Sequence, residues 1–250
     1  MSRALRWWVL GVGVAGVGAV MVLAFLSIPA FGSTHHPYRD LAVPAAVAHG
    51  TANVVGSVTF DQRGIDTLGE EAIFFGSVLA VSALLRPTQH ERQQQESGSL
   101  VPLQSTRWSG YLLLPLTLMV ALDIVGHGHV TPGGGFQGGI MLATALHLVY
   151  VAGQYRSLER LRPMPLFENG EAAGIAAFAA LGLAGIGVTG SFLANVVPYG
   201  TFGQILSAGT VPLLNIAVGL AVGSGGIVMV GKFFEQVFLV SDDGGKAGGS

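Results

Sequence analysis

The stretch Asp123–Gly139 reads DIVGHGHVTPGGGFQGG and carries two histidines, one proline and seven glycines. It lies between two apolar runs that are each long enough to cross a bilayer. The glycines Gly133–Gly135 can adopt positive φ without steric cost, Pro132 suits the first turn of a helix, and Thr131 suits its N-cap. The stretch therefore predicts a tight turn that returns the chain into the membrane, with bare backbone exposed to a neighbour.

Composition identifies a membrane protein. Half of the residues are hydrophobic, 10% are charged and the mean hydropathy is +0.59, whereas a soluble domain carries about a quarter charged residues. The net charge of −2 gives no electrostatic basis for binding nucleic acid. The absence of cysteine excludes disulfides, thiolate metal sites and cysteine nucleophiles.

Six apolar segments predict an all-α, polytopic integral membrane protein with about six transmembrane helices. They cover residues 7–28, 65–85, 108–125, 138–152, 172–197 and 211–230. A signal peptide is the alternative for the first segment, but its apolar core would be unusually long and Ile28-Pro29-Ala30 is a poor cleavage site. With the N-terminus inside, only Arg39 and Arg63 of the twelve basic residues lie outside, so both termini are expected in the cytoplasm.

A polar segment divides the chain. Residues 87–107 are rich in Gln and Ser and predict a cytoplasmic linker. It separates a module at 1–86 with two spans from a module at 108–240 with four spans. Residues 153–170 form a predicted basic loop, and residues 241–250 are expected to be a disordered tail.

Acidic residues crowd the head of the second span. Asp66 and Glu70 are four residues apart and share a helix face, whereas Glu71 points about 100° away. An unpaired carboxylate in hydrocarbon costs at least a few kcal/mol, so these side chains need a partner, a cavity or water. They are candidates for ion or proton handling. The alternatives are a first helical turn whose dipole favours acids, and an ion pair with a lysine of a neighbouring chain.

Histidines supply further candidates for a proton path. Asp123 and His127 are four residues apart at the outer end of the third span. They are either a point of proton uptake or release or a polar pair at the helix end. His147 lies roughly 22 Å beyond Pro132 along its helix, as either a packing residue or a relay. The pair His127 and His129 falls short of the three or four protein ligands of a usual metal site, so no metal or cofactor is predicted.

The glycine turn has an expected geometric role. No Lys-Ser/Thr follows its glycines, which excludes a phosphate loop. Gly219 and Gly223 in the last span have the small-xxx-small spacing of closely packed membrane helices. The turn should let a neighbouring subunit come close, through the following residues: Pro132, Gly133, Gly134, Gly135, Phe136, Gly138 and Gly139.

Two motifs resemble known modules. The segment GHGHVTPGGGFQGG, with its flanking spans over residues 106–240, closely resembles the B subunit (MnhB or MrpB) of multisubunit Mrp-type Na⁺/H⁺ antiporters, a module that also occurs in membrane-bound hydrogenases of the complex I superfamily. The segment DQRGIDTLGEE from Asp61 resembles the MbhE-like module at the carboxy end of the large MrpA protein of these antiporters, where the run usually reads DFRGxDTxGE. It covers residues 41–86, and Gln62 departs from the usual aromatic. The two modules are adjacent parts of the same assemblies.

The resemblance implies a component of an Mrp-type antiporter in a prokaryotic plasma membrane. Its partners would be the other subunits, the lipid bilayer, and Na⁺ and H⁺ as transported ions, and it would not be an enzyme. No lysine precedes Lys232, so the chain lacks the mid-membrane lysine of the large subunits and is expected to shape an ion path and dock those subunits. The alternatives are a membrane-arm component of a redox-driven complex such as a hydrogenase, and a purely structural assembly subunit.

Overall fold

The computed structural model describes residues 3–28, 32, 34, 36–86, 103–152 and 163–246, with the backbone alone for Tyr150, Val151 and 235–246. The chain forms two compact units, Met1–Leu41 and Ala42–Ser250. Over the described ranges the structure is helical and its one β feature is an isolated bridge between Gly200 and Ser207. The all-α prediction is therefore confirmed.

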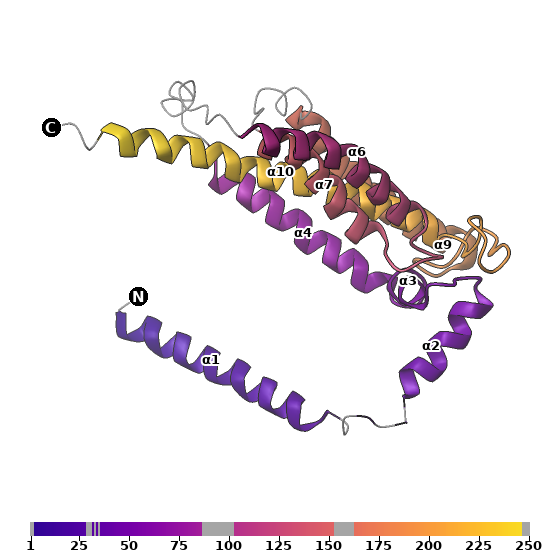
Figure 1. Ribbon diagram of the computed structural model, residues 1–250. Coiled ribbons are helices and arrows are strands. Elements are labelled where there is room, and N and C mark those ends of the chain that lie inside the picture. Colours follow the sequence, from indigo (N-terminus) through magenta and orange to yellow (C-terminus); the bar gives the residue numbers. More distant parts are fainter. Residues whose placement is uncertain are drawn as a thin grey trace. The chain divides into compact units, whose positions relative to one another are not determined.

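The described residues form nine helical segments, and Figure 1 labels the α-helices among them. The nine segments are α1 (Arg3–Leu26), α2 (Pro37–Ala48), α3 (Val54–Ser57), the π-helix η1 (Val58–Gln62), α4 (Gly64–Leu84), α6 (Gln104–Gly126), α7 (Gly135–Val151), α9 (Met164–Thr189) and α10 (Val211–Lys246). Five of them are long and apolar enough to cross a membrane, namely α1, α4, α6, α9 and the first two-thirds of α10. The shorter α7, with 17 residues, corresponds to the fourth predicted span, residues 138–152.

In the first unit, α1 is a single apolar helix of 24 residues with a mean hydropathy of 2.5 over its most apolar stretch. All of its residues are exposed. A helix that is apolar on every side suits a lipid environment. This supports a membrane span at residues 3–26, two to four residues before the predicted boundaries.

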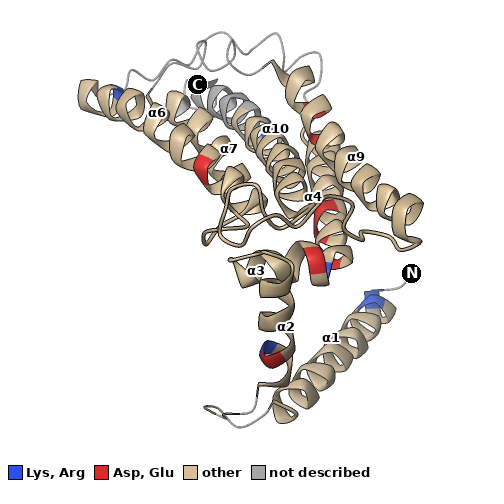
Figure 2. Ribbon diagram, turned by 90° about the vertical axis from the view of Figure 1, so that its right-hand side faces the viewer, with Lys and Arg blue, Asp and Glu red and all other residues tan. Residues whose placement is uncertain are grey.

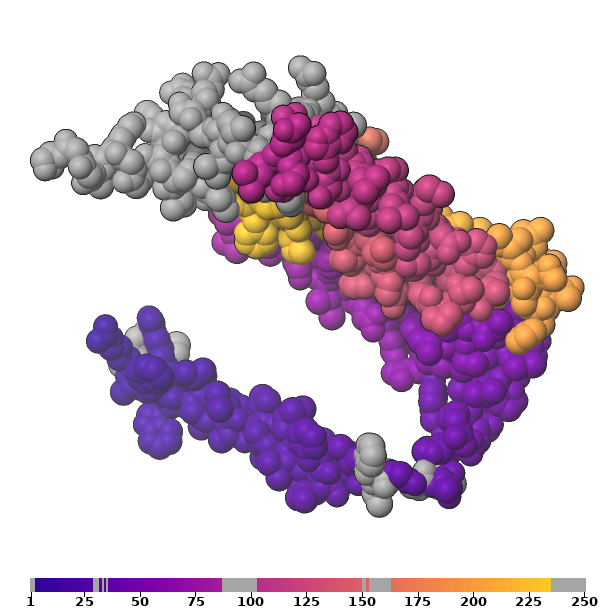
Figure 3. Space-filling model, viewed as in Figure 1, coloured from indigo at the N-terminus to yellow at the C-terminus, as the bar shows by residue number. Residues whose placement is uncertain are grey.

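In the second unit, α10 is the central helix. The helices α4, α7 and α9 pack along it, and α6 packs mainly on α7 (Figure 1). On the side shown in Figure 3, α6 and α7 cover most of α10. Leu214, Val218 and Val222 of α10 are almost fully buried and meet Phe178 of α9. The last span is thus the core of the second unit, and α4, α7 and α9 surround it.

Glycines allow α7 and α10 to approach at backbone distance. A Cβ added at Gly139 would stand 2.9 Å from the Gly223 nitrogen and 3.0 Å from the Gly219 oxygen. A Cβ added at Gly135 would stand 2.8 Å from the Gly219 nitrogen. The small-xxx-small pair on α10 therefore meets an equally spaced pair on α7. We expected a neighbouring subunit to meet the glycines of the turn, but α10 of the same chain occupies this position.

The turn before α7 depends on two glycines with positive φ. Gly133 and Gly134 have φ values of 139° and 151°, which L side chains rarely adopt. This extended double-glycine step delays the helix, which begins at Gly135. Pro132 therefore lies before the helix and not in its first turn, contrary to the prediction.

The start of α7 is capped from α10. The Gly135 amide donates a hydrogen bond of 2.8 Å to Oδ1 of Asn215, which is fully buried. Thr131, the N-cap suggested by the sequence, instead donates from Oγ1 to the His127 carbonyl. The first amides of a helix lack partners within the helix, and here a side chain of the central helix supplies one.

The segment before α4 holds the turn from the other side. Nδ2 of Asn53 donates to the carbonyls of Gly128, at 2.7 Å, and of Thr131, at 3.1 Å. The backbone N–H of Asn53 donates to the carbonyl of His129 at 3.0 Å. These bonds join the two predicted modules, 1–86 and 108–240, through backbone oxygens of the turn.

The predicted boundaries between the modules remain predictions. Most of the linker, residues 87–102, and the arginines of the basic loop at positions 156, 160 and 162 lie outside the described residues. We expected a disordered tail from residue 241, whereas the described helix α10 ends at Lys246.

His129 is a buried part of the turn. Its side chain is 0% exposed, and Nε2 donates to the carbonyl of Ile205 at 3.0 Å. Nδ1 has no hydrogen-bond partner among the described residues. Burial lowers the pKa of His129 below its usual value of 6.5, and the hydrogen bond to Ile205 opposes this effect.

The contact between α7 and α10 predicts the effect of adding one methyl group. Gly135→Ala should lower the stability of the second unit by about 1–3 kcal/mol, because the new Cβ meets backbone that cannot move away. The check is thermal unfolding of the purified protein in mild detergent. The control is Gly187→Ala in α9, where a Cβ would meet nothing within 4 Å and alanine favours the helix. Equal melting temperatures for the two variants would contradict the packing.

His129 predicts a loss of stability in mild acid. The folded chain resists protonation of this ring, while the unfolded chain accepts a proton near pH 6.5. The contribution of the ring to the free energy of unfolding is therefore complete above that pH and falls as the pH drops below it. The decrease in melting temperature between pH 7.5 and pH 5.5 should be smaller in His129→Gln than in the wild type. The exposed His36, changed to Gln, should keep the wild-type decrease, and an equal response of both variants would refute the assignment.

Candidate ion and proton site

The three acidic candidates of α4 have different surroundings. Asp66 is exposed and forms an ion pair with Arg63, so it belongs to the helix end. Glu70 is also exposed, whereas Glu71 is only 1% exposed and points into the helix bundle. The angle between positions 70 and 71 on a helix accounts for this division. The structure therefore does not bring all three carboxylates to one site.

A pocket of about 220 Å³ lies between the glycine turn and the segment η1–α4. Glu70 and Gln137 reach its wall from α4 and α7, and Thr59 and Thr67 line it as well. Oγ1 of Thr67 donates to the Thr59 carbonyl at 2.7 Å, which fixes η1 against α4. Single π-helical turns occur often at functional sites, because they break the regular helix pattern. Thr67 and Glu70 line the pocket on the side of α4, whereas Phe60, Phe136 and Val218 make other parts of its wall apolar.

Glu71 has no hydrogen-bond partner on either carboxylate oxygen among the described residues. It interacts electrostatically with Glu70 and, across the bundle, with Glu171 of α9. Glu171 is only 2% exposed, and its Oε1 also lacks a partner in the described part of the chain. Figure 2 marks acidic positions on both α4 and α9 in red. Two buried carboxyl groups from different modules thus occupy one apolar bundle.

Sequence reasoning missed Glu171. The span was predicted to begin at residue 172, but α9 begins at Met164, which places Glu171 about 10 Å into the helix. The spacing of residues in the sequence could have indicated that Glu171 is buried, because it lies in register with residues that recur every three or four positions along one helix face. The buried residues of this face are Glu171, Gly174, Phe178, Gly182 and Gly185. An acid in register with such a stripe faces the protein and not the lipid.

Asp123 and His127 form the pair that their spacing predicts. Nδ1 of His127 lies 2.8 Å from Oδ1 of Asp123, and the two side chains are 38% and 67% exposed. The exposure fits a polar contact at the end of α6. His129 has a different partner, Ile205, so the two histidines of the HxH motif do not act together. Over the described residues, no group of three or more His, Asp and Glu side chains is arranged to hold a metal ion.

His147 lies near the other end of the bundle. Its Nδ1 is 2.6 Å from the carbonyl of Ala143, one turn earlier on α7. Its ring meets the ring of Phe234 on α10 edge-on, with 5.4 Å between centroids. Both contacts fit the packing interpretation, and the relay role remains a prediction.

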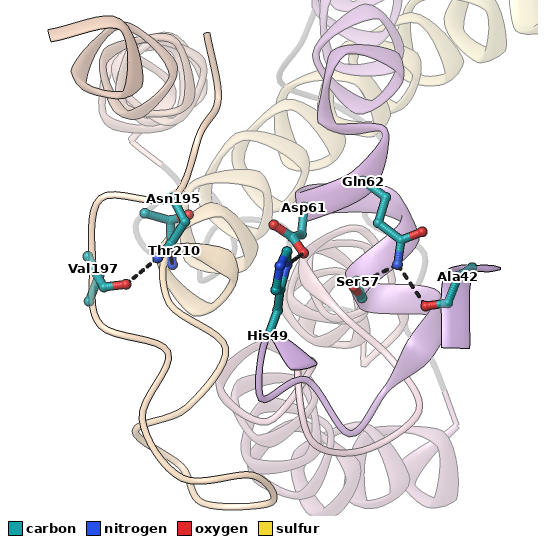
Figure 4. A network of polar contacts seen from close by, with 8 residues as sticks. All are labelled: Ala42, His49, Ser57, Asp61, Gln62, Asn195, Val197 and Thr210. Atoms are coloured by element: carbon teal, nitrogen blue, oxygen red, sulfur yellow. Dashed lines mark hydrogen bonds and ion pairs between the residues drawn. The ribbon is translucent and has the colours of Figure 1, made fainter. Parts of the chain in front are cut away.

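Polar contacts that the sequence analysis did not anticipate surround η1, where His49 faces Asp61 and Gln62 faces Ser57 and Ala42 (Figure 4). Nδ1 of His49 lies 2.5 Å from Oδ2 of Asp61, and the His49 ring stacks on Tyr199 with 4.5 Å between centroids. Burial, and then the charge of Asp61, raise the pKa of Tyr199 above its usual value. Gln62, at the unusual position of the second motif, donates from Nε2 to the Ala42 carbonyl and to Oγ of Ser57.

Comparison with known proteins gives these features a context. Residues 106–229 match a family described as a domain related to the MnhB subunit of Na⁺/H⁺ antiporter. An uncharacterised protein of Methanocaldococcus jannaschii is 35% identical over a 206-residue alignment, and the match covers 69% of this chain and 73% of that protein. A probable K⁺/H⁺ antiporter A/B subunit of Rhizobium meliloti is 33% identical over 143 residues, which are 47% of this chain but 14% of that longer protein.

Two solved structures share the fold. A chain of the membrane-bound sulfane sulfur reductase, an archaeal respiratory membrane complex, is 26% identical with a TM-score of 0.71, and the match covers 92% of this chain and 98% of that one. A chain of the Mrp complex from Dietzia sp. is 26% identical with a TM-score of 0.65, and the match covers 93% of this chain and 26% of that one. The protein therefore belongs to the same family as the Methanocaldococcus protein, and its residues 106–229 form a domain related to the MnhB subunit of Na⁺/H⁺ antiporters.

Proposed function

We propose that this chain is an integral membrane subunit of an Mrp-type antiporter complex, which exchanges cytoplasmic Na⁺ for external H⁺. The observation that carries the proposal is the likeness to the Mrp complex over 93% of this chain, since it includes both modules and not the MnhB-related domain alone. In this assignment the chain is part of a transporter and not an enzyme, both termini are cytoplasmic, and the complex lies in a prokaryotic plasma membrane.

The role of the chain within the complex is to contribute to an ion path and to dock larger subunits. Buried carboxyl groups in a membrane bundle are costly and commonly belong to ion or proton routes, which supports a role for Glu71. The pocket beside Glu70, whose lining is partly polar, is a second place where an ion and water could be accommodated. The exposed apolar side chains of α4, among them Ile65, Ile73 and Leu79, suit a face against another membrane subunit.

A second candidate is a membrane-arm subunit of a redox-driven respiratory complex. The observation that favours it is the match to the sulfane sulfur reductase, which covers 98% of that chain at the higher TM-score of 0.71. In that complex the two modules together correspond to one chain, as they do here.

Transport measurements test the contribution to an ion path. Deleting the chain should abolish Na⁺/H⁺ exchange in membrane vesicles. The double change of Glu70→Gln and Glu71→Gln should abolish exchange while the complex still assembles, because the isosteric amides keep the packing and remove the charges. The control is Glu168→Gln on the exposed side of α9, which should keep wild-type exchange. A purely structural subunit predicts that the double variant transports normally.

Companion proteins discriminate between the two complexes. The tagged chain should purify in mild detergent only with other membrane subunits if it serves an antiporter. Co-purification of iron–sulfur and Ni–Fe or other redox subunits, identified by mass spectrometry, would favour the respiratory complex and refute the antiporter assignment.

A further inference from the structure

Glu171 meets α10 at the place where Phe74 of α4 also contacts it. A Cβ added at Gly225 of α10 would stand 2.5 Å from Oε1 of Glu171 and 2.7 Å from the ring of Phe74. Phe74 lies three residues after Glu71, one turn further along the same face of α4. Glu171 therefore reaches, from α9, into the gap where α4 meets α10, and Glu71 points into the same bundle. The absence of a side chain at Gly225 provides the room for the carboxyl group.

No described cation neutralises this pair. The only basic side chain that the described parts of α4, α9 and α10 carry is Lys232, seven residues beyond Gly225 and about 10 Å further along the helix. Arg63 pairs with Asp66, and His49 pairs with Asp61 of η1. The other acids of the same helices, Glu70 and Glu168, are exposed.

Full ionisation of both groups would be costly. Each buried carboxylate loses its hydration, and two like charges in a medium of low dielectric repel each other strongly. The orphaned oxygens lack hydrogen-bond donors that could replace water. Binding one proton to one of the two carboxylates converts it to a neutral acid, which removes the repulsion and supplies an O–H donor.

We propose that Glu71 and Glu171 form a single proton-binding site at the junction of the two modules, which carries one proton between two buried carboxyl groups. The step is simple protonation of a carboxylate to a carboxylic acid. Proton binding by the pair follows from its burial. A role for this proton in ion exchange rests in addition on the proposed function.

Carbodiimide labelling tests the site, because dicyclohexylcarbodiimide reacts with protonated carboxyl groups in apolar surroundings. The intact complex in native membranes is treated near pH 7 and the labelled residues are identified by mass spectrometry. Glu71 or Glu171 should be labelled and the exposed Glu168 should not. Glu171→Gln should reduce labelling of Glu71 by about threefold or more, since the second carboxylate no longer repels the ionised form. Asp40→Asn, which changes an exposed acid of α2 outside the helices α4, α9 and α10, should leave it unchanged.

Three results would overturn the site. They are absence of label at both glutamates, label at Glu71 that does not respond to Glu171→Gln, and protection by excess Na⁺, which would indicate a cation site instead. A carboxylic-acid C=O band in infrared spectra of the purified complex, lost in the double change of Glu71→Gln and Glu171→Gln, gives an independent readout. Labelling in a complex that exchanges no Na⁺ would refute the proposed function and leave the proton site intact.

Discussion

The fold depends on backbone-distance contact between α7 and α10. Glycines on both helices remove the side chains that would hold them apart, and the side-chain oxygen of Asn215 accepts the first free amide of α7. Dispersion and hydrogen bonding drive helix association in a bilayer, because lipid tails are as apolar as the side chains. Close approach of the two helices increases dispersion, and the buried hydrogen bond from the Gly135 amide to Asn215 supplies the hydrogen bonding. The turn of Gly133–Gly135 places α7 at this distance.

Polar groups inside the bundle fall into two classes. Asn215, Asn53 and His129 bind backbone groups of the turn and its neighbouring loop, so their polarity is used for structure. Glu71 and Oε1 of Glu171 have no hydrogen-bond partner in the described chain, although both residues are almost completely buried. A structural role accounts for the first class and leaves the second unexplained, which is why the acids and not the histidines of the turn are the stronger candidates for ion chemistry.

Much of the fold could be predicted from composition and periodicity. The apolar segments, the glycine turn and the small-xxx-small pair Gly219 and Gly223 all have local signatures, and each corresponds to a feature of the structure. The partner of the turn could not be predicted, because a single sequence does not show that α10 rather than another subunit covers Gly135. Glu171 was missed for a related reason. Its depth depends on where α9 begins, and helix starts are weakly marked when no capping residue is present.

Asn53 binds the carbonyl oxygens of Gly128 and Thr131, and its amide binds that of His129. Every amino acid has such an oxygen, so these hydrogen bonds across the seam between the modules place little demand by themselves on the side chains opposite Asn53, although close packing restricts Gly128, where a Cβ would stand 2.6 Å from the Gly134 Cα. A seam of this kind can survive sequence drift on one side, and it can hold whether the two halves share one polypeptide or are made as separate proteins. The covalent link then sets stoichiometry and local concentration, while recognition combines these main-chain atoms with the apolar packing of α4 and η1 on α10.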